Sequence, residues 1–75
     1  MRTTYQLMRQ FEGQEPEAIF TSTRKDEIER FFNRMMKSFR KDDKFMVQLK
    51  NSGYAIVTLF STCGMADTEY FICKA

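Results

Sequence analysis

Histidine is absent from this 75-residue chain, and its absence removes several kinds of chemistry at once. Histidine is the usual general base, the usual partner of a serine or cysteine nucleophile, and the commonest metal ligand. The three glycines, Gly13, Gly53 and Gly64, are isolated, so neither a phosphate-binding loop nor a dinucleotide fingerprint can form. The sequence therefore predicts a protein that is not an enzyme, with no catalytic residue, no metal site and no cofactor.

Cysteine and long apolar runs are also scarce. Cys63 and Cys73 are too few for a disulfide framework or for a four-cysteine zinc site within one chain. We expect two reduced thiols in or near a sheet, with a disulfide or an intersubunit metal site as the alternatives. No apolar run approaches the ~20 residues of a membrane span, and Met1-Arg2-Thr3-Thr4 has no apolar signal core. We therefore expect a cytoplasmic protein that does not contact a membrane.

The composition fits one small folded domain over residues 1–75. Apolar residues make up 43% of the chain, too many for a disordered segment, and 75 residues are too few for two cores. A domain of this size buries only about 60% of its extended-chain surface, so dimerisation or partner binding is the expected supplement to its stability. The formal net charge of +2 argues against an acidic surface that mimics nucleic acid.

Alternation of apolar and polar residues predicts strands on both sides of a central helix. Residues 3–11 and 17–21 form a hairpin around the turn-forming stretch 12–16. Residues 44–50 and 54–60 form a second hairpin around Asn51-Ser52-Gly53, with Gly53 in the left-handed position. A loop over 62–67 then leads to a closing strand over 68–74. The predicted fold is α+β: an antiparallel sheet of about five strands in the order ββαβββ, with one amphipathic helix packed on one face.

The length of the second hairpin loop fixes the predicted register, which pairs Lys50 with Tyr54, Gln48 with Ile56, Met46 with Thr58 and Lys44 with Phe60. One face then joins the helix in a core and carries Phe45, Val47, Leu49, Ala55, Val57 and Leu59. The opposite, open face carries a first candidate site: Met46, Lys50, Tyr54, Ile56 and Phe60. An exposed apolar patch is typical of an interface with a partner or a second copy, although a loop or chain end folded over it also explains it. Aromatic and basic residues on a sheet also suit RNA, but the aromatic signature of the RNA-recognition motif is missing.

Residues 26–41 place two opposed stripes on the predicted helix. At roughly 100° per residue, one sector carries Ile28, Phe32, Met35 and Phe39, flanked by Phe31 and Met36. The opposite sector carries a second candidate site, formed by the cations Arg30, Arg34, Lys37 and Lys41. The helix dipole explains part of this cationic stripe, but the like-charge pairs Arg30 with Arg34 and Lys37 with Lys41 do not favour the helix. The stripe is suited to a nucleic-acid backbone or an acidic protein patch, and a solvated charged face is the structural alternative.

Helix start signals precede these stripes. Ser22 or Thr23 is the predicted N-cap, with Asp26 three residues after Thr23 in a capping-box-like position. Asp26 is also placed to pair with Arg30 four residues on.

In size and outline, the chain resembles the small phage-encoded proteins that disable bacterial immunity, in particular anti-CRISPR proteins. The resemblance covers the whole chain and rests on a histidine-free sequence with a hairpin, one helix, a returning sheet and no catalytic motif. It implies a stoichiometric inhibitor that occludes a bacterial nucleoprotein defence complex in the host cytoplasm. The alternatives are a small nucleic-acid-binding module that uses the helix or the open sheet face, and a homodimeric structural or regulatory protein.

Overall fold

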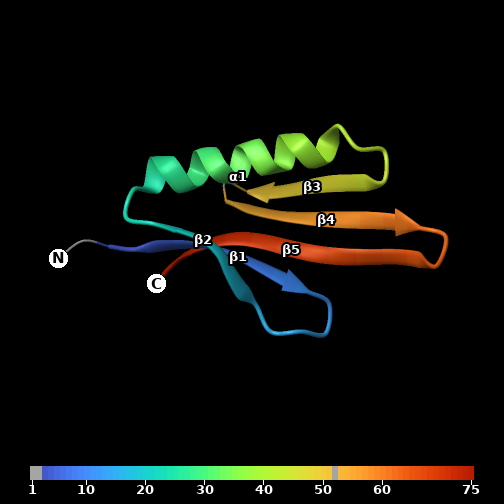
Figure 1. The fold of residues 1–75 in the computed structure, drawn as a ribbon, viewed down its shortest axis with the longest axis horizontal. Coiled ribbons are helices and arrows are strands. Elements are labelled where there is room, and N and C mark those ends of the chain that lie inside the picture. The colour runs from blue at the N-terminus through green and yellow to red at the C-terminus, as the bar shows by residue number, and fades with distance from the viewer. Residues whose placement is uncertain (1–2, 52) are drawn as a thin grey trace.

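Five strands and one helix make up the fold, in the predicted order. The computed structural model describes residues 3–51 and 53–75. Its elements, shown in Figure 1, are β1 (Tyr5–Phe11), β2 (Glu17–Ser22), α1 (Lys25–Arg40), β3 (Phe45–Asn51), β4 (Tyr54–Ser61) and β5 (Gly64–Lys74). All paired strands are antiparallel and form one sheet in the order β2-β1-β5-β4-β3. The predicted α+β fold with the order ββαβββ is confirmed.

The last strand in sequence lies at the centre of the sheet. β5 pairs with β1, where Leu7 lies opposite Ile72, and with β4, where Ala55 lies opposite Tyr70. Consequently, the ends of the described chain lie near one another in Figure 1, and the Ala75 amide donates to the Thr4 carbonyl at 2.8 Å. α1 connects β2 and β3, which are the two edge strands of the sheet.

The core lies between α1 and the middle of the sheet. Its buried side chains, each at most 6% exposed, are Leu7, Ile28, Phe32, Met36, Ala55, Val57 and Tyr70. Ile28 and Phe32 confirm the predicted apolar stripe, but Met36, predicted only to flank it, is buried. Met35 and Phe39 are half-buried instead. The difference arises because the sheet contacts the helix along a row of residues spaced four apart, which is one straight ridge of a helix surface.

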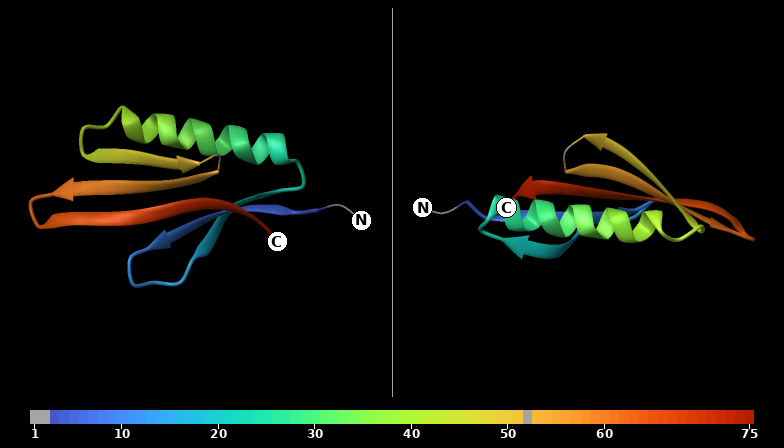
Figure 2. Two further views of the ribbon diagram at one scale, coloured as in Figure 1. Left: turned by 180° about the vertical axis from the view of Figure 1, so that it is seen from behind. Right: turned by 90° about the horizontal axis from the view of Figure 1, so that it is seen from above.

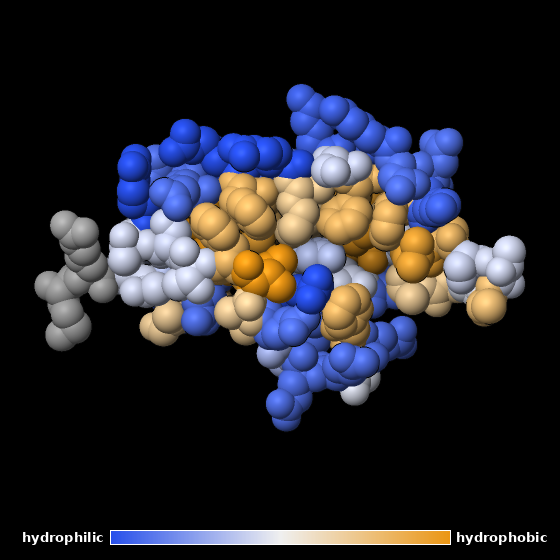
Figure 3. Space-filling model, in the orientation of Figure 1, coloured by the Kyte–Doolittle hydropathy of each residue, from blue (hydrophilic) through white to orange (hydrophobic). Residues whose placement is uncertain are grey.

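α1 covers only part of the sheet face on which it packs. Phe20 and Phe31 stack beside the core with ring centroids 4.3 Å apart, and both are half-buried. Leu49 and Leu59 lie on this face in the predicted register but remain 51% and 37% exposed. Figure 3 shows an apolar region across the middle of this side of the molecule, bordered by hydrophilic residues above and below.

The predicted loop over 62–67 is wrong because β5 already begins at Gly64. A short turn joins β4 to β5, with Gly64 at a φ of +126°, and Phe60 and Met65 lie opposite one another just beyond it. The Thr58 hydroxyl donates to Asp67 Oδ1 at 2.7 Å across the two strands. The first part of β5 has small and polar residues that are typical of a loop, but it forms a strand because it pairs with β4.

The predicted pairing of Lys50 with Tyr54 is also wrong. The register shifts between Leu49 and Asn51, so that Asn51 lies opposite Tyr54. Gly53 has the predicted left-handed conformation, with a φ of +84°, and Ser52 of the predicted loop lies outside the described residues.

The helix begins one residue before the predicted range and ends one residue before its predicted end. Its N-cap is Arg24, which has no side-chain cap hydrogen bond, rather than Ser22 or Thr23. Ser22 still belongs to β2, and its Oγ accepts a hydrogen bond from the Arg24 amide at 3.0 Å. The path of the chain out of the edge strand therefore overrides the local capping signal.

Candidate functional site

The cationic stripe lies on the solvent side of α1, opposite the buried row. Arg30, Arg34, Lys37 and Lys41 are all exposed, and Lys41 is the C-cap residue. The predicted pair of Asp26 with Arg30 is confirmed at 3.4 Å, and Arg24 reaches the same carboxylate at 3.2 Å. Partial desolvation raises the pKa of Asp26, but Arg24 and then Arg30 outweigh it, so this pKa lies below its ordinary value.

This ion pairing divides the stripe into two halves. At the helix N-terminus, Asp26 offsets the charge of Arg30, and Lys25 lies 4.0 Å from Glu29. Toward the C-terminus, Arg34, Lys37 and Lys41 form no ion pair with any residue of the described segments. The C-terminal half of α1 is therefore the more electropositive part of the helix.

The open face of the sheet is built as predicted from β3 and β4. Tyr54, Ile56 and Phe60 alternate with the buried Ala55 and Val57 and thus point away from α1. Met46 joins them from β3 because it lies opposite Thr58. Met46 and Phe60 are 49% and 40% exposed, whereas Tyr54 and Ile56 are half-buried. Lys50 is exposed and lies at the register shift.

β1 and β5 extend this face with residues that the sequence did not assign to the site. Phe71 lies opposite both Tyr54 and Met8, and Met65 lies opposite Phe60. The Tyr54 and Phe71 rings have centroids 6.4 Å apart. The signal for Phe71 is its position next to the buried Tyr70, since neighbours in a strand face opposite sides. The residues around Phe71 are apolar at successive positions, so the sequence alone does not show whether Tyr70 or Phe71 faces the helix.

Carboxylates lie among these apolar side chains. Glu69 is opposite Ile56, and Asp67 is opposite Thr58. Desolvation and then the neighbouring Glu69 raise the pKa of Tyr54 above its ordinary value. Apart from Lys50 at its edge, the open face therefore combines apolar and acidic character, unlike the electropositive surface that binds a phosphate backbone.

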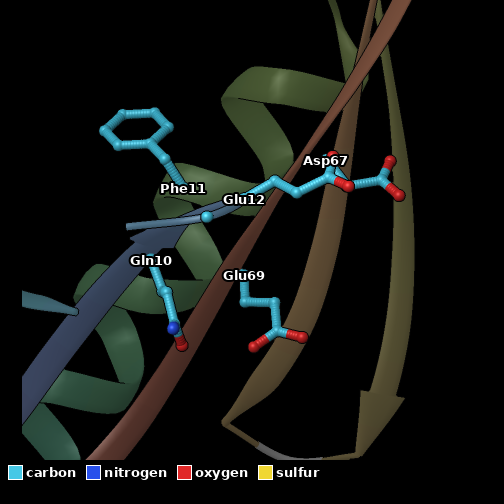
Figure 4. A pocket seen from close by; sticks show the side chains of 6 residues that line it. Gln10, Phe11, Glu12, Asp67 and Glu69 are labelled. Atoms are coloured by element: carbon cyan, nitrogen blue, oxygen red, sulfur yellow. The ribbon is translucent and has the colours of Figure 1, made fainter. Parts of the chain in front are cut away.

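A shallow pocket of about 280 Å³ adjoins the open face near the β1–β2 turn. It is lined by Gln10, Phe11, Glu12, Gly13, Asp67 and Glu69, none of which is basic. Figure 4 shows Phe11 of β1 pointing away from Gln10 and from Glu69 of β5, as expected because Phe11 lies on the opposite face of the sheet. This pocket lacks the cations that an anionic ligand needs.

The remaining features of the described residues concern the two cysteines, metal-binding groups and membrane spans. Cys63 is exposed and Cys73 is half-buried, and both are free thiols. Within residues 3–51 and 53–75, no group of three or more acidic or cysteine side chains is arranged to hold a metal ion. The same segments contain no helix that is both long and apolar enough to cross a membrane.

Comparison of the chain with protein-family models, with curated proteins and with solved structures finds no match. The physical character of the open face and of the cationic stripe is therefore the basis for a functional proposal.

Proposed function

We propose that this protein is a non-enzymatic binding protein that acts at a fixed ratio to a protein partner, with the open sheet face as its partner-binding surface. The proposal is supported chiefly by the apolar side chains on the side of the sheet opposite α1. Met46, Phe60 and Met65 are well exposed there, beside the aromatic pair of Tyr54 and Phe71. Exposed apolar and aromatic side chains gathered in this way are characteristic of protein interfaces.

The proposed target is a bacterial nucleoprotein defence complex, as the outline shared with phage-encoded inhibitors implies. Occlusion of such a complex requires a stable contact and no chemistry. The exposed cations at the C-terminal half of α1, Arg34, Lys37 and Lys41, supply a second contact for an acidic protein patch or for nucleic acid held by the complex.

The charges on the open face favour a protein partner over nucleic acid. Glu69 and Asp67 lie among its apolar residues, so a phosphate backbone laid across it meets like charge. A nucleic-acid-binding module, the second candidate, therefore depends on the cationic stripe alone. Homodimerisation through the open face is the third candidate, and it predicts that Tyr54→Ser with Phe60→Ser dissociates a dimer of the free protein.

Expression in bacteria that carry an active RNA-guided defence complex tests the proposed target. We expect the protein to restore plaque formation by a targeted phage, and to inhibit the purified complex with an end point at a fixed molar ratio. Turnover of a substrate by the pure protein contradicts the non-enzymatic part of the proposal. Unchanged phage restriction with each class of RNA-guided complex contradicts the target.

Two neighbouring residues of β4 allow a matched test of the binding surface. Phe60 and Leu59 are similarly exposed, at 40% and 37%, but face opposite sides of the sheet. We expect Tyr54→Ser with Phe60→Ser to abolish inhibition, and Leu59→Ser to preserve it, with circular dichroism as the folding control. If the double variant does not fold, Met46→Ser with Phe60→Ser replaces it, because both side chains are exposed. Full inhibition by the folded variant excludes the open face.

The cationic stripe is tested by changing Arg30, Arg34, Lys37 and Lys41 to Gln. If the stripe contacts the target, binding weakens by at least about tenfold, since hydrogen bonds to charged groups contribute roughly 1.5–3 kcal/mol. The melting temperature is the control, because exposed ion pairs contribute little to folding. If binding of the parent protein weakens steeply as the salt concentration rises, the contact is with nucleic acid rather than through an apolar protein interface.

A further inference from the structure

Strand β3 presents an open backbone edge, since it is outermost in the sheet order. The Phe60 amide donates to the Lys44 carbonyl at 2.7 Å, so the backbone of Lys44 faces β4. The alternation of an antiparallel ladder turns the backbone groups of Met46 and Gln48 the same way. It therefore leaves the N–H and C=O groups of Val47 and Leu49 pointing outward, toward the space beside the sheet.

Over residues 45–49, β3 lacks the features by which edge strands usually avoid pairing with other chains, because its lysine, Lys50, follows this segment. Residues 45–49 include no charge and no proline, and the register shift of β3 comes only after Leu49. The opposite edge strand, β2, follows Pro16, begins with the exposed Glu17 and carries a register shift against β1. Of the two edges, β3 is the one suited to strand addition.

The C-terminal half of β3 is also accessible. The right-hand view of Figure 2 shows the end of this strand diverging from α1. Met46 and Leu49 expose about half of their side chains, 49% and 51%, on opposite faces of the strand. A strand added beside β3 would cover apolar surface on both faces of the sheet as well as satisfy its backbone groups.

We propose that β3 pairs antiparallel with β3 of a second copy of this chain, about a two-fold axis at Gln48. In this register, Val47 lies opposite Leu49 of the second copy, and both residues have outward backbone groups. Because of the two-fold symmetry, Leu49 also lies opposite Val47 of the second copy, so this hydrogen-bonded pair occurs twice. Gln48 then meets its own counterpart, and Met46 lies opposite Lys50 of the second copy.

The charges of β3 select this register and a second copy as the occupant. A register centred on Val47 places Lys44 opposite Lys50 of the second copy, and like charges directly opposite one another destabilise a strand pair. A register centred on Leu49 places Val47 opposite Asn51 of the second copy, which lies beyond the register shift of β3, so the shift disrupts the central pairs. The Gln48 register avoids both defects and uses the whole uncharged segment 45–49, so the strand is complementary to itself. This inference goes beyond the proposed function, because β3 pairing does not involve the target.

Sedimentation equilibrium of the purified full chain is the first test. We expect a species of twice the 9.0 kDa chain mass that dissociates on dilution. Val47→Pro removes an outward N–H but no hydrogen bond to β4, so it is expected to abolish the dimer, as proline is tolerated at strand edges. Val47→Thr keeps the N–H and the side-chain shape and is expected to preserve the dimer. A parent protein that stays at 9.0 kDa at submillimolar concentration overturns the proposal, even if a foreign strand binds β3.

Disulfide trapping tests the register in a variant with Cys63→Ser and Cys73→Ser. Residues facing each other at a non-hydrogen-bonded antiparallel position have Cα atoms about 4.5 Å apart, within the range that a disulfide spans. Gln48→Cys is therefore expected to form a covalent dimer on mild oxidation, whereas Lys50→Cys, which does not face its own counterpart, is not.

Opposite charges provide a second measure of the same contact. Gln48→Glu and Gln48→Lys are each expected to weaken the dimer severalfold, and an equimolar mixture of the two is expected to restore it as a heterodimer. A dimer that resists Val47→Pro overturns the edge assignment. Trapping at residue 50 in place of residue 48 overturns the register.

Discussion

Tyr70 is the largest polar side chain in the core and connects three parts of the fold. It lies opposite Ala55 of β4 and Arg9 of β1, and its ring centroid is 5.6 Å from that of Phe39 on α1. Desolvation raises the pKa of its phenol, and the neighbouring Arg9 only partly counteracts this effect. The folded protein therefore favours the neutral form of Tyr70 more strongly than the unfolded chain does.

This preference predicts a loss of stability in alkaline solution. The stabilising contribution is fully present below the unfolded-state tyrosine pKa of about 10, and it is lost as the pH rises from there through the higher folded-state pKa. We expect urea midpoints to fall between about pH 9 and about pH 11 more steeply in the parent than in Tyr70→Phe, which has no phenol to ionise. Parallel curves for the two proteins would show that Tyr70 ionises equally easily in both states.

Arg24 is an unusual start for α1. It has the extended backbone of an N-cap residue, with a φ of −108°, but makes no side-chain hydrogen bond to the first turn. Asparagine is a preferred N-cap because its side-chain oxygen accepts a hydrogen bond from an otherwise unpaired amide. The helix therefore begins without one of its common sources of stability.

An Asn at this position is expected to stabilise the protein relative to an Ala. Both Arg24→Asn and Arg24→Ala remove the ion pair with Asp26, so the comparison isolates the cap. We expect Arg24→Asn to exceed Arg24→Ala by about 1 kcal/mol in the free energy of unfolding, measured by chemical denaturation. Equal denaturation midpoints and slopes would contradict a missing cap.

Local patterns predicted the elements well where neighbouring residues determine them. Alternation in β3 and β4, together with the left-handed Gly53, placed Met46, Ile56 and Phe60 on the correct face. The start of β5 was missed because Gly64 and Asp67 are typical of loops, and only pairing with β4 makes that segment a strand. The N-cap was missed because β2 extends through Ser22.

At the scale of the whole molecule, the fold is long and thin, with extents of 48 × 26 × 17 Å. The β4–β5 turn extends past the end of α1 in Figure 1. Residues 59–67 are all exposed, whereas Ala55 and Tyr70 are buried further along the same two strands. Packing therefore decreases along the β4–β5 hairpin toward its turn.

This gradient predicts unequal hydrogen exchange along two paired strands. Amides of β4 and β5 in the segment from Leu59 to Met65 are expected to exchange through local opening, faster than those of Ala55 and Tyr70, which require opening of the core. Exchange followed residue by residue by NMR measures this difference. Uniform protection along the hairpin would mean that its turn opens only with the whole domain.

The sheet order could not be predicted because it depends on contacts between residues distant in sequence. Tyr70, Phe71 and Ile72 suit burial on either side, so their alternation alone does not show which face meets α1. This also explains why the sequence located the open-face residues of one hairpin but not Phe71, Glu69 and Met65 beside them. The link to phage-encoded inhibitors stays a prediction.

The central position of β5 has a consequence for how the chain folds. The β1–β2 hairpin and the β3–β4–β5 unit each form from strands that follow one another in the sequence. In the sheet they are joined only by the pairing of β1 with β5. This step brings together segments about seventy residues apart, such as Tyr5 and Lys74, which makes it slow compared with hairpin closure. Until it occurs, β1 and β5 both expose backbone edges that are interior in the native sheet. Chains in which both units are complete but β1 and β5 have not yet paired are therefore the most prone to aggregation.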